Sequence, residues 1–146
     1  ADARGAFLGL SLAHGRAHMT RAVLEGVCFA LRDSLTILHE LGLRPQSLLL
    51  TGGGARSAFV RRLQAEIFGV PVCTVNREEG PAYGAALLAA VGVGAFADLA
   101  AATGATLRRG APERPDPSAH AGYQRHYDRY RAAFPAALTE VRLRPS

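Results

Sequence analysis

Apolar residues recur along the first third of the chain at spacings of three and four. The positions are Val23, Leu24, Val27, Leu31, Leu35, Leu38 and Leu41. This period predicts a long amphipathic helix from about Ala17 to Leu41, with Gly42 and Pro45 as its stop signals. Gly26 lies inside this helix, where glycine costs about 1 kcal/mol relative to alanine. We therefore expect another backbone to approach Gly26 closely.

Shorter apolar runs flank the next helical pattern. Ser47 to Thr51 and Val70 to Val75 predict two short strands, the first of them buried. Between them, Ser57 is a favourable N-cap and Gly69 a stop signal. The apolar face of the helix that they bound is marked by Phe59, Val60, Leu63, Ile67 and Phe68.

A third helix is predicted after the second strand. Residues 77–80 form a polar loop, and Pro81 suits the first position of a helix with the sequence PAYGAALLAAVG. The alternation of strands and helices predicts α/β layering. Ahead of all these elements, residues 5–12 mix glycine with apolar residues and predict a strand or an extended arm.

The character of the chain changes after about Leu99. Glycine, proline and charge dominate residues 103–119, which predicts a loop, and residues 1–102 form the core of the domain. A C-terminal helix occupies residues 120–146, most clearly between His120 and Ala133, and packs on the domain. An aromatic stripe of Tyr123, Tyr127, Tyr130 and Phe134 is typical of such packing.

Composition limits the classes of protein. The chain has 146 residues, of which 49% are hydrophobic and 20% charged, as in one soluble globular domain. No apolar run reaches the roughly 20 residues of a membrane helix, and no signal peptide is recognisable. The chain does not begin with Met, so we expect a piece of a longer protein. Cys28 and Cys73 lie in apolar surroundings and are expected to be buried thiols, which favours the cytoplasm.

A net charge of +5 raises the question of a nucleic-acid partner. The positive charge is carried by arginine alone, and the arginines are scattered, with no run longer than a pair. We therefore expect no nucleic-acid partner and no membrane partner.

The stretch TGGGARS, residues 51–57, places three glycines between a strand and a helix. Gly52, Gly53 and Gly54 would let a ligand approach the main chain, and the helix that follows Ser57 would direct free N–H groups toward it. The stretch matches neither G-x-G-x-x-G nor G-x-x-x-x-G-K-[ST]. By itself it indicates either a nucleotide site or a tight structural turn.

Other chemistry finds little support in the sequence. His14, His18 and His39 lack the spacing of a zinc site, and Ser57 lacks the G-x-S-x-G context of a hydrolase nucleophile. Glu25, Asp33 and Glu40 are as easily explained by solvation or helix ends. We assign no catalytic residue and no metal ligand.

Residues 5–25, GAFLGLSLAHGRAHMTRAVLE, closely resemble the C-terminal signature of the FGGY carbohydrate kinases. Gly5, Phe7, Gly9 and Leu10 match first, and after a spacer His18, Met19, Ala22, Val23, Leu24 and Glu25 match. LTGGGARS, GVPV and EEGPAYGAALLA continue the family's order. These motifs and the tail YQRHYDRYRAAFPA most resemble the xylulokinase branch.

The resemblance implies a partial actin-like, ribonuclease-H-like ATPase domain, with a mixed sheet flanked by helices. It implies ATP and Mg²⁺ as cofactors. Gly52, Gly53 and Gly54 would lie beside the α-phosphate and ribose, and Ser57 near the base or sugar. The sugar, most simply D-xylulose, would bind mainly through an N-terminal domain that precedes this segment.

The implied reaction transfers the γ-phosphoryl group of ATP to a primary hydroxyl of a ketopentose. Its catalytic base lies outside these residues, so we expect the segment alone to be inactive. The alternatives are an FGGY kinase for another pentose, gluconate or glycerol, and a non-catalytic actin-like binding module. Only about three strands are recognisable, and the exposed sheet edge favours self-association, including a homodimer.

Overall fold

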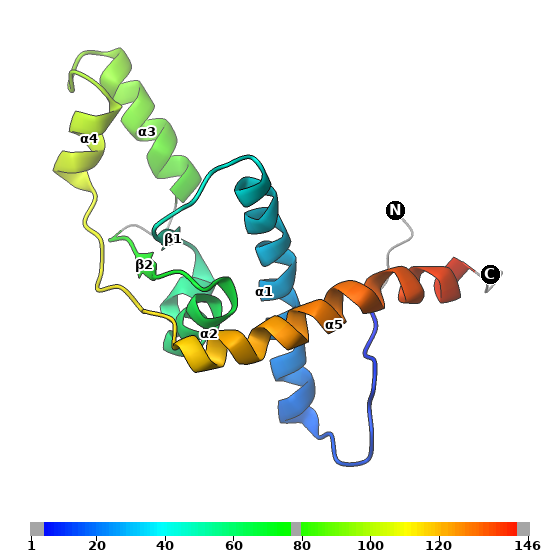
Figure 1. The fold of residues 1–146 in the computed structure, drawn as a ribbon. Coiled ribbons are helices and arrows are strands. Elements are labelled where there is room, and N and C mark those ends of the chain that lie inside the picture. The colour runs from blue at the N-terminus through cyan, green and yellow to red at the C-terminus, as the bar shows by residue number, and fades with distance from the viewer. Residues whose placement is uncertain (1–4, 77–79, 143–146) are drawn as a thin grey trace. The chain divides into compact units, whose positions relative to one another are not determined.

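The computed structural model describes residues 5–76 and 80–142, with side chains as far as residue 133 in the last helix. The chain divides into two compact units. The terminal unit combines residues 1–43 with 116–146, and the central unit comprises residues 44–115. Figure 1 shows the elements of each.

The terminal unit is built from two long helices. They are α1 (Arg16–Glu40) and α5 (Pro117–Arg142), which pack on each other (Figure 1). The observed α1 confirms the predicted helix to within one residue at each end. Its C-terminus is closed by Gly42, whose φ of 81° is left-handed. The N–H of Gly42 donates to the His39 carbonyl at 3.0 Å, and that of Leu43 donates to Leu38 at 2.9 Å. This is the Schellman pattern.

Aromatic rings form the core of the terminal unit. Phe29 of α1 is 5% exposed, and its ring centroid lies 6.2, 5.9 and 5.4 Å from those of Tyr123, Tyr127 and Tyr130 of α5. The predicted packing of the tyrosine stripe is confirmed for these three residues, whereas the side chain of Phe134 lies outside the described residues.

Two expectations for this unit are wrong, and a third holds in one of its two alternatives. Most of the predicted apolar face of α1 is exposed, namely Val23, Val27, Leu31, Leu38 and Leu41. Helix α1 instead buries Cys28 and Phe29, because α5 packs on that side of Phe29. A Cβ at Gly26 would meet no atom of the described residues within 4 Å, so no backbone among them approaches it closely. Of the two alternatives for residues 5–12, a strand or an extended arm, the described chain shows the arm.

The central unit contains a small parallel sheet. Strands β1 (Leu48–Leu50) and β2 (Val72–Thr74) pair in parallel, with Leu48 opposite Val72 and Leu50 opposite Thr74. Both are shorter than predicted, and β1 is only partly buried, with Leu49 exposed. Antiparallel bridges from Arg109 and Glu113 cover the other edge of β2. Within the described residues, β1 has no second neighbour.

Helix α2 (Ala58–Phe68) connects the two strands and supplies more buried core residues than any other element of the unit. Its two predicted ends are confirmed: Ser57 accepts a hydrogen bond from the N–H of Val60, and Gly69 adopts a φ of 72°. Leu63, Ala65 and Ile67 are buried, and Val72 and Cys73 of β2 are buried as well. The predicted apolar position Phe59 is exposed.

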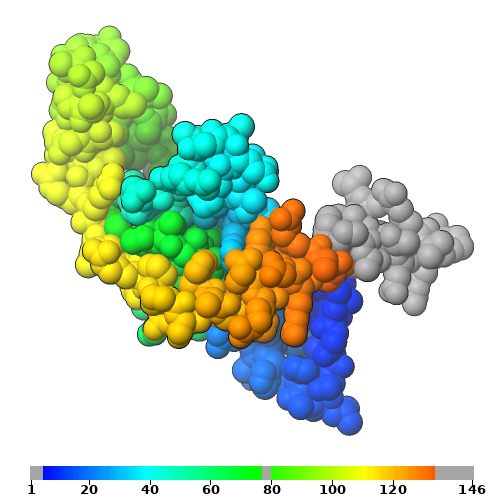
Figure 2. All heavy atoms as spheres, viewed as in Figure 1, coloured from blue at the N-terminus to red at the C-terminus, as the bar shows by residue number. Residues whose placement is uncertain are grey.

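The remaining helices of the central unit are α3 (Gly80–Gly92) and α4 (Leu99–Thr106). They pack against each other, as the green and yellow-green atoms of Figure 2 show. Helix α3 begins one residue before Pro81, and residues 77–79 of the predicted polar loop lie outside the described residues. Helix α4 was not predicted, and it shortens the expected loop, which begins only at Leu107.

Candidate nucleotide-binding site

The glycine turn follows the carboxyl end of β1. Gly52 has φ 81° and ψ −176°, a backbone conformation that is almost exclusive to glycine. Gly53–Arg56 then form one short 3₁₀ turn, η1, before Ser57 starts α2. The glycine at position 52 is therefore required by the direction that the chain takes out of the sheet.

In the described chain, the N–H groups of the first two residues of η1 are free to donate. The N–H of Ala55 donates to the Gly52 carbonyl at 3.1 Å, and that of Ser57 to Gly54 at 3.3 Å. The N–H groups of Gly53 and Gly54 have no acceptor in the part of the chain that the structure describes. Unpaired donors at the start of a helical turn are the groups that bind anions.

The space over the turn is open. A Cβ at Gly52 or Gly53 would meet no atom of the described residues within 4 Å, and one at Gly54 would lie 3.7 Å from Cγ1 of Val60. All three glycines are exposed. The turn therefore combines free donors with room for a ligand, and the structure brings the three predicted glycines together at one surface.

Ser57, the fourth predicted site residue, has a structural role in the turn. Its Oγ accepts a hydrogen bond from the N–H of Val60 at 3.4 Å and so caps α2. The hydroxyl hydrogen is still available, because the oxygen acts there as the acceptor. Capping and donation to a ligand are thus compatible at this exposed residue.

Helix α3 begins close to the turn. A Cβ at Gly80 would lie 3.4 Å from Oγ1 of Thr51, so glycine allows the helix to start against the residue that precedes the three glycines. A largely apolar hollow of about 310 Å³ lies alongside. It is lined by Leu49, Thr51, Val75, Gly80, Tyr83, Gly84, Leu87, Leu88, Leu99, Thr103 and Leu107.

Sequence reasoning missed one residue that contacts the turn. Nη1 of Arg61, on the first turn of α2, donates to the carbonyls of Ala55 at 2.8 Å and Arg56 at 3.0 Å. In the sequence, Arg61 is one of the scattered arginines and belongs to no motif. The spacing of five and six residues back to the carbonyls corresponds to no common helix motif, so the sequence offered no signal.

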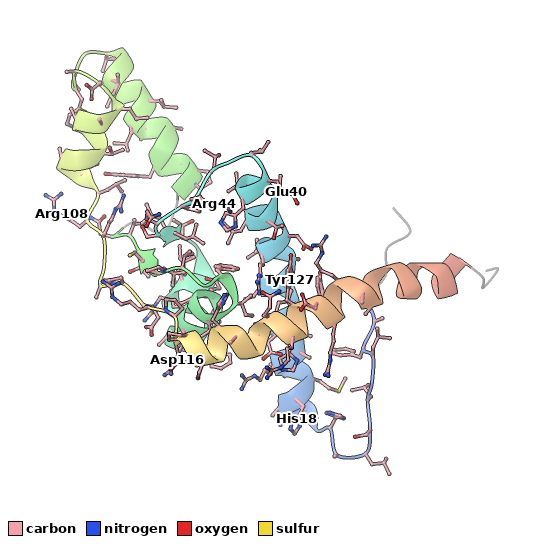
Figure 3. The ribbon with its side chains drawn as sticks, in the orientation of Figure 1. His18, Glu40, Arg44, Arg108, Asp116 and Tyr127 are labelled. Atoms are coloured by element: carbon pink, nitrogen blue, oxygen red, sulfur yellow. The ribbon has the colours of Figure 1, made fainter. Side chains whose placement is uncertain are left out.

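Two acidic residues of α1 join it to α5. Oε1 of Glu25 accepts hydrogen bonds from the Tyr123 hydroxyl at 2.9 Å and from Nε of Arg21 at 2.7 Å. The Tyr127 hydroxyl, which points from α5 toward α1 in Figure 3, donates to Asp33. Both carboxylates therefore act in helix packing, a role that neither solvation nor a helix end describes.

Burial raises the pKa of several side chains between α1 and α5. It is the main cause that raises the pKa of the Tyr123 and Tyr127 hydroxyls, and hydrogen bonds to Glu25 and Asp33 add to the effect. Burial also raises the pKa of the Cys28 thiol to about 11. Cys28 and Cys73 are both free and buried, as predicted.

Metal and membrane sites are not evident. Among the residues that the structure describes, no three His, Cys, Asp or Glu side chains could together hold a metal ion. In the same residues, every helix is too short or too polar to cross a membrane.

Comparison with known proteins identifies the family. Residues 1–93 match the model of the C-terminal domain of the FGGY family of carbohydrate kinases. The chain belongs to the FGGY family. A curated relative, the xylulose kinase of Staphylococcus epidermidis, is 38% identical over 134 residues, which are 92% of this chain and 27% of that protein. The chain thus spans about a quarter of the length of the curated relatives it matches.

Solved FGGY structures share the fold. The ligand-bound xylulose kinase from Lactobacillus acidophilus has a TM-score of 0.84 and 33% identity, covering 92% of this chain and 27% of that one. The gluconate kinase from the same organism also has a TM-score of 0.84 and 33% identity, covering 94% of this chain and 28% of its own. The predicted fold class, part of an actin-like ATPase domain, is confirmed.

Proposed function

We propose that this chain is the nucleotide-binding C-terminal part of an ATP-dependent sugar kinase whose substrate is D-xylulose. The observation that carries the proposal is the open glycine turn, which presents two unpaired N–H groups in a member of the FGGY family. Similarity to xylulose kinases supports the choice of sugar.

Each site residue has a defined part in this proposal. Gly52 sets the direction of the turn, and the N–H groups of Gly53 and Gly54 donate to phosphate oxygens. The positive end of α2 favours the same negative charge. Ser57 donates its hydroxyl to the sugar or base of the nucleotide while it caps α2. Bound ATP supplies the γ-phosphoryl group.

Magnesium finds no ligand set in the described residues, because no acidic or histidine cluster faces the turn. Mg²⁺ in phosphoryl-transfer sites is commonly held by phosphates, water and one or two carboxylates. We therefore derive no step through the metal from these residues.

The remaining parts of the reaction lie outside this segment. Glu25 and Asp33, the acidic residues weighed for catalysis, are engaged with α5 in the described chain, so we assign to this segment no base for the proton of the sugar hydroxyl. We therefore propose that the segment alone is inactive and that the sugar binds through an N-terminal domain. The free, buried thiols suit the cytoplasm, which we include in the proposal.

A calorimetric titration with MgADP tests the nucleotide site. The wild-type chain should release heat on binding, and Gly53→Val should abolish that heat. Because a Cβ at Gly53 meets no atom within 4 Å, the variant should keep its circular dichroism spectrum while its side chain occupies the space over the turn. Equal heats from the two well-folded proteins would mean that the nucleotide binds elsewhere, and the proposed site would be wrong.

The similarity to a gluconate kinase supports a second candidate substrate. Comparison of kcat/KM for D-xylulose, gluconate and glycerol in the full-length polypeptide decides among them. A polypeptide that binds MgADP but phosphorylates no sugar would instead be a non-catalytic actin-like module.

A further inference from the structure

Arg61 and its neighbour Arg62 make different contacts. Arg62 is exposed and pairs with Glu66, four residues along the helix, at 3.0 Å. The Arg61 side chain is partly buried and folds back over the start of α2, where Nη1 contacts two carbonyl oxygens of η1. Within the described residues, Arg61 has no carboxylate partner, so these carbonyls are its only hydrogen-bond acceptors.

The carbonyls that Arg61 holds are linked to the free donors of the glycine turn. A peptide group is planar, so the direction of a carbonyl also fixes the N–H of the next residue. The Arg56 carbonyl, bound by Arg61, shares its plane with the N–H of Ser57. That N–H donates to the Gly54 carbonyl, whose plane contains the N–H of Ala55. The N–H of Ala55 donates to Gly52, whose plane contains the free N–H of Gly53.

This series of linked peptide planes, here called the relay, matters because the turn consists largely of glycines. Three consecutive glycines have wide conformational freedom, and nothing in their own side chains can hold the turn in one geometry. Ordering such a segment at the moment of binding weakens affinity. The guanidinium is a strong, charge-assisted donor at the ordered end of α2, and it fixes the last peptide plane of the relay. The guanidinium also covers two carbonyl oxygens, whose partial negative charge would repel a phosphate.

We propose that Arg61 is a positioning residue for nucleotide binding. It contacts no ligand in this proposal, which rests on the proposed function of the glycine turn. It acts by keeping the N–H of Gly53 directed at the open face of the turn before the nucleotide arrives.

The test compares three variants in the full-length polypeptide that carries this sequence. Arg61→Met keeps the apolar stem and removes the donors, Arg61→Lys keeps a charged donor, and Arg62→Met is the matched control on the same turn of α2. We expect Arg61→Met to raise the Kd for MgADP, measured by calorimetry, about tenfold. Arg61→Lys should recover most of this loss, and Arg62→Met should bind as the wild type does.

Kinetics separate positioning from general damage. Arg61→Met should raise KM for ATP, with kcat and KM for the sugar close to wild type. Loss of kcat together with a raised KM for the sugar would assign Arg61 to overall stability and overturn the proposal. If Arg61→Met does not fold, Arg61→Gln replaces it with the same expectation, and failure of both to fold would also overturn the proposal.

The two proposals can fail independently. Wild-type binding that equals that of a folded Arg61→Met would refute positioning by Arg61 and leave the nucleotide site intact. Absence of MgADP binding in the folded wild-type polypeptide would refute the proposed function itself.

Discussion

At the scale of single residues, the glycines of the turn have separable roles. Gly52 adopts a φ of 81°, whereas Gly53 does not have a positive φ, and a Cβ would fit at either position. Gly52→Ala should therefore lower the free energy of unfolding by about 1–3 kcal/mol through backbone strain alone. Urea unfolding followed by circular dichroism measures the change.

Gly53→Ala is the matched control for that strain. Its backbone is compatible with alanine, so it should be neutral or stabilise the chain by up to about 1 kcal/mol. Equal destabilisation by the two variants would show that the left-handed conformation of Gly52 is not the cause.

Sequence reasoning could place the four candidate residues at one turn because the motif TGGGARS and the end of a strand are local signals. The sequence did not decide between a nucleotide site and a structural turn. Which N–H groups lack a partner depends on the backbone conformation, and the sequence motif does not give that conformation. Arg61 could not be predicted for a different reason. Its contacts depend on how far a long side chain folds back over the helix, which no residue spacing indicates.

At the scale of elements, hydrophobic period and stop signals predicted α1 and α2 closely. The period did not predict which face of α1 would be buried, because this depends on the partner: α5 covers Phe29 and leaves Val27 exposed. The sequence did not predict α4, because its glycine and threonine residues are not typical of a helix. Its N-cap was nevertheless visible, since Asp98 accepts a hydrogen bond from the N–H of Ala101 at 2.7 Å. In the same way, Asp116 caps α5, which begins at Pro117, three residues before its predicted start.

Alkaline pH should destabilise the helices of the terminal unit. Burial raises the pKa of Cys28 to about 11 and also raises that of Tyr123. The folded state therefore holds these protons more tightly than the unfolded chain. Their contribution is complete below the ordinary thiol pKa of about 9 and is lost as pH rises through the folded values.

For Cys28 the loss should reach about 2 kcal/mol between pH 9 and 11. Urea midpoints measured at intervals from pH 7 to 11 should fall in that window. The fall should be shallower in Cys28→Ala, which has no thiol to ionise, although its midpoint at pH 7 is lower through lost packing. A wild-type midpoint that is constant up to pH 11 would contradict this account.

At the scale of the whole molecule, the chain is about a quarter of the length of its curated relatives. Large apolar side chains are exposed on both units, among them Leu31 of α1 and Leu49 of β1. Residues 108–113 protect the outer edge of β2, whereas the outer edge of β1 has no partner in the described chain. Open edges and apolar surface of this kind favour association with another chain.

We therefore predict that the 146-residue chain self-associates as its concentration rises. Sedimentation velocity from about 5 to 200 µM should show a shift toward dimer or larger species, driven mainly by the edge of β1. Leu49→Lys places a charge on that edge and should shift the chain back toward monomer. Leu43→Lys is the matched control, because Leu43 is also exposed but lies ahead of the strand. If both variants reduced association equally, general apolar surface rather than the strand edge would be its cause. A wild-type chain that is monomeric at every concentration would contradict the prediction altogether.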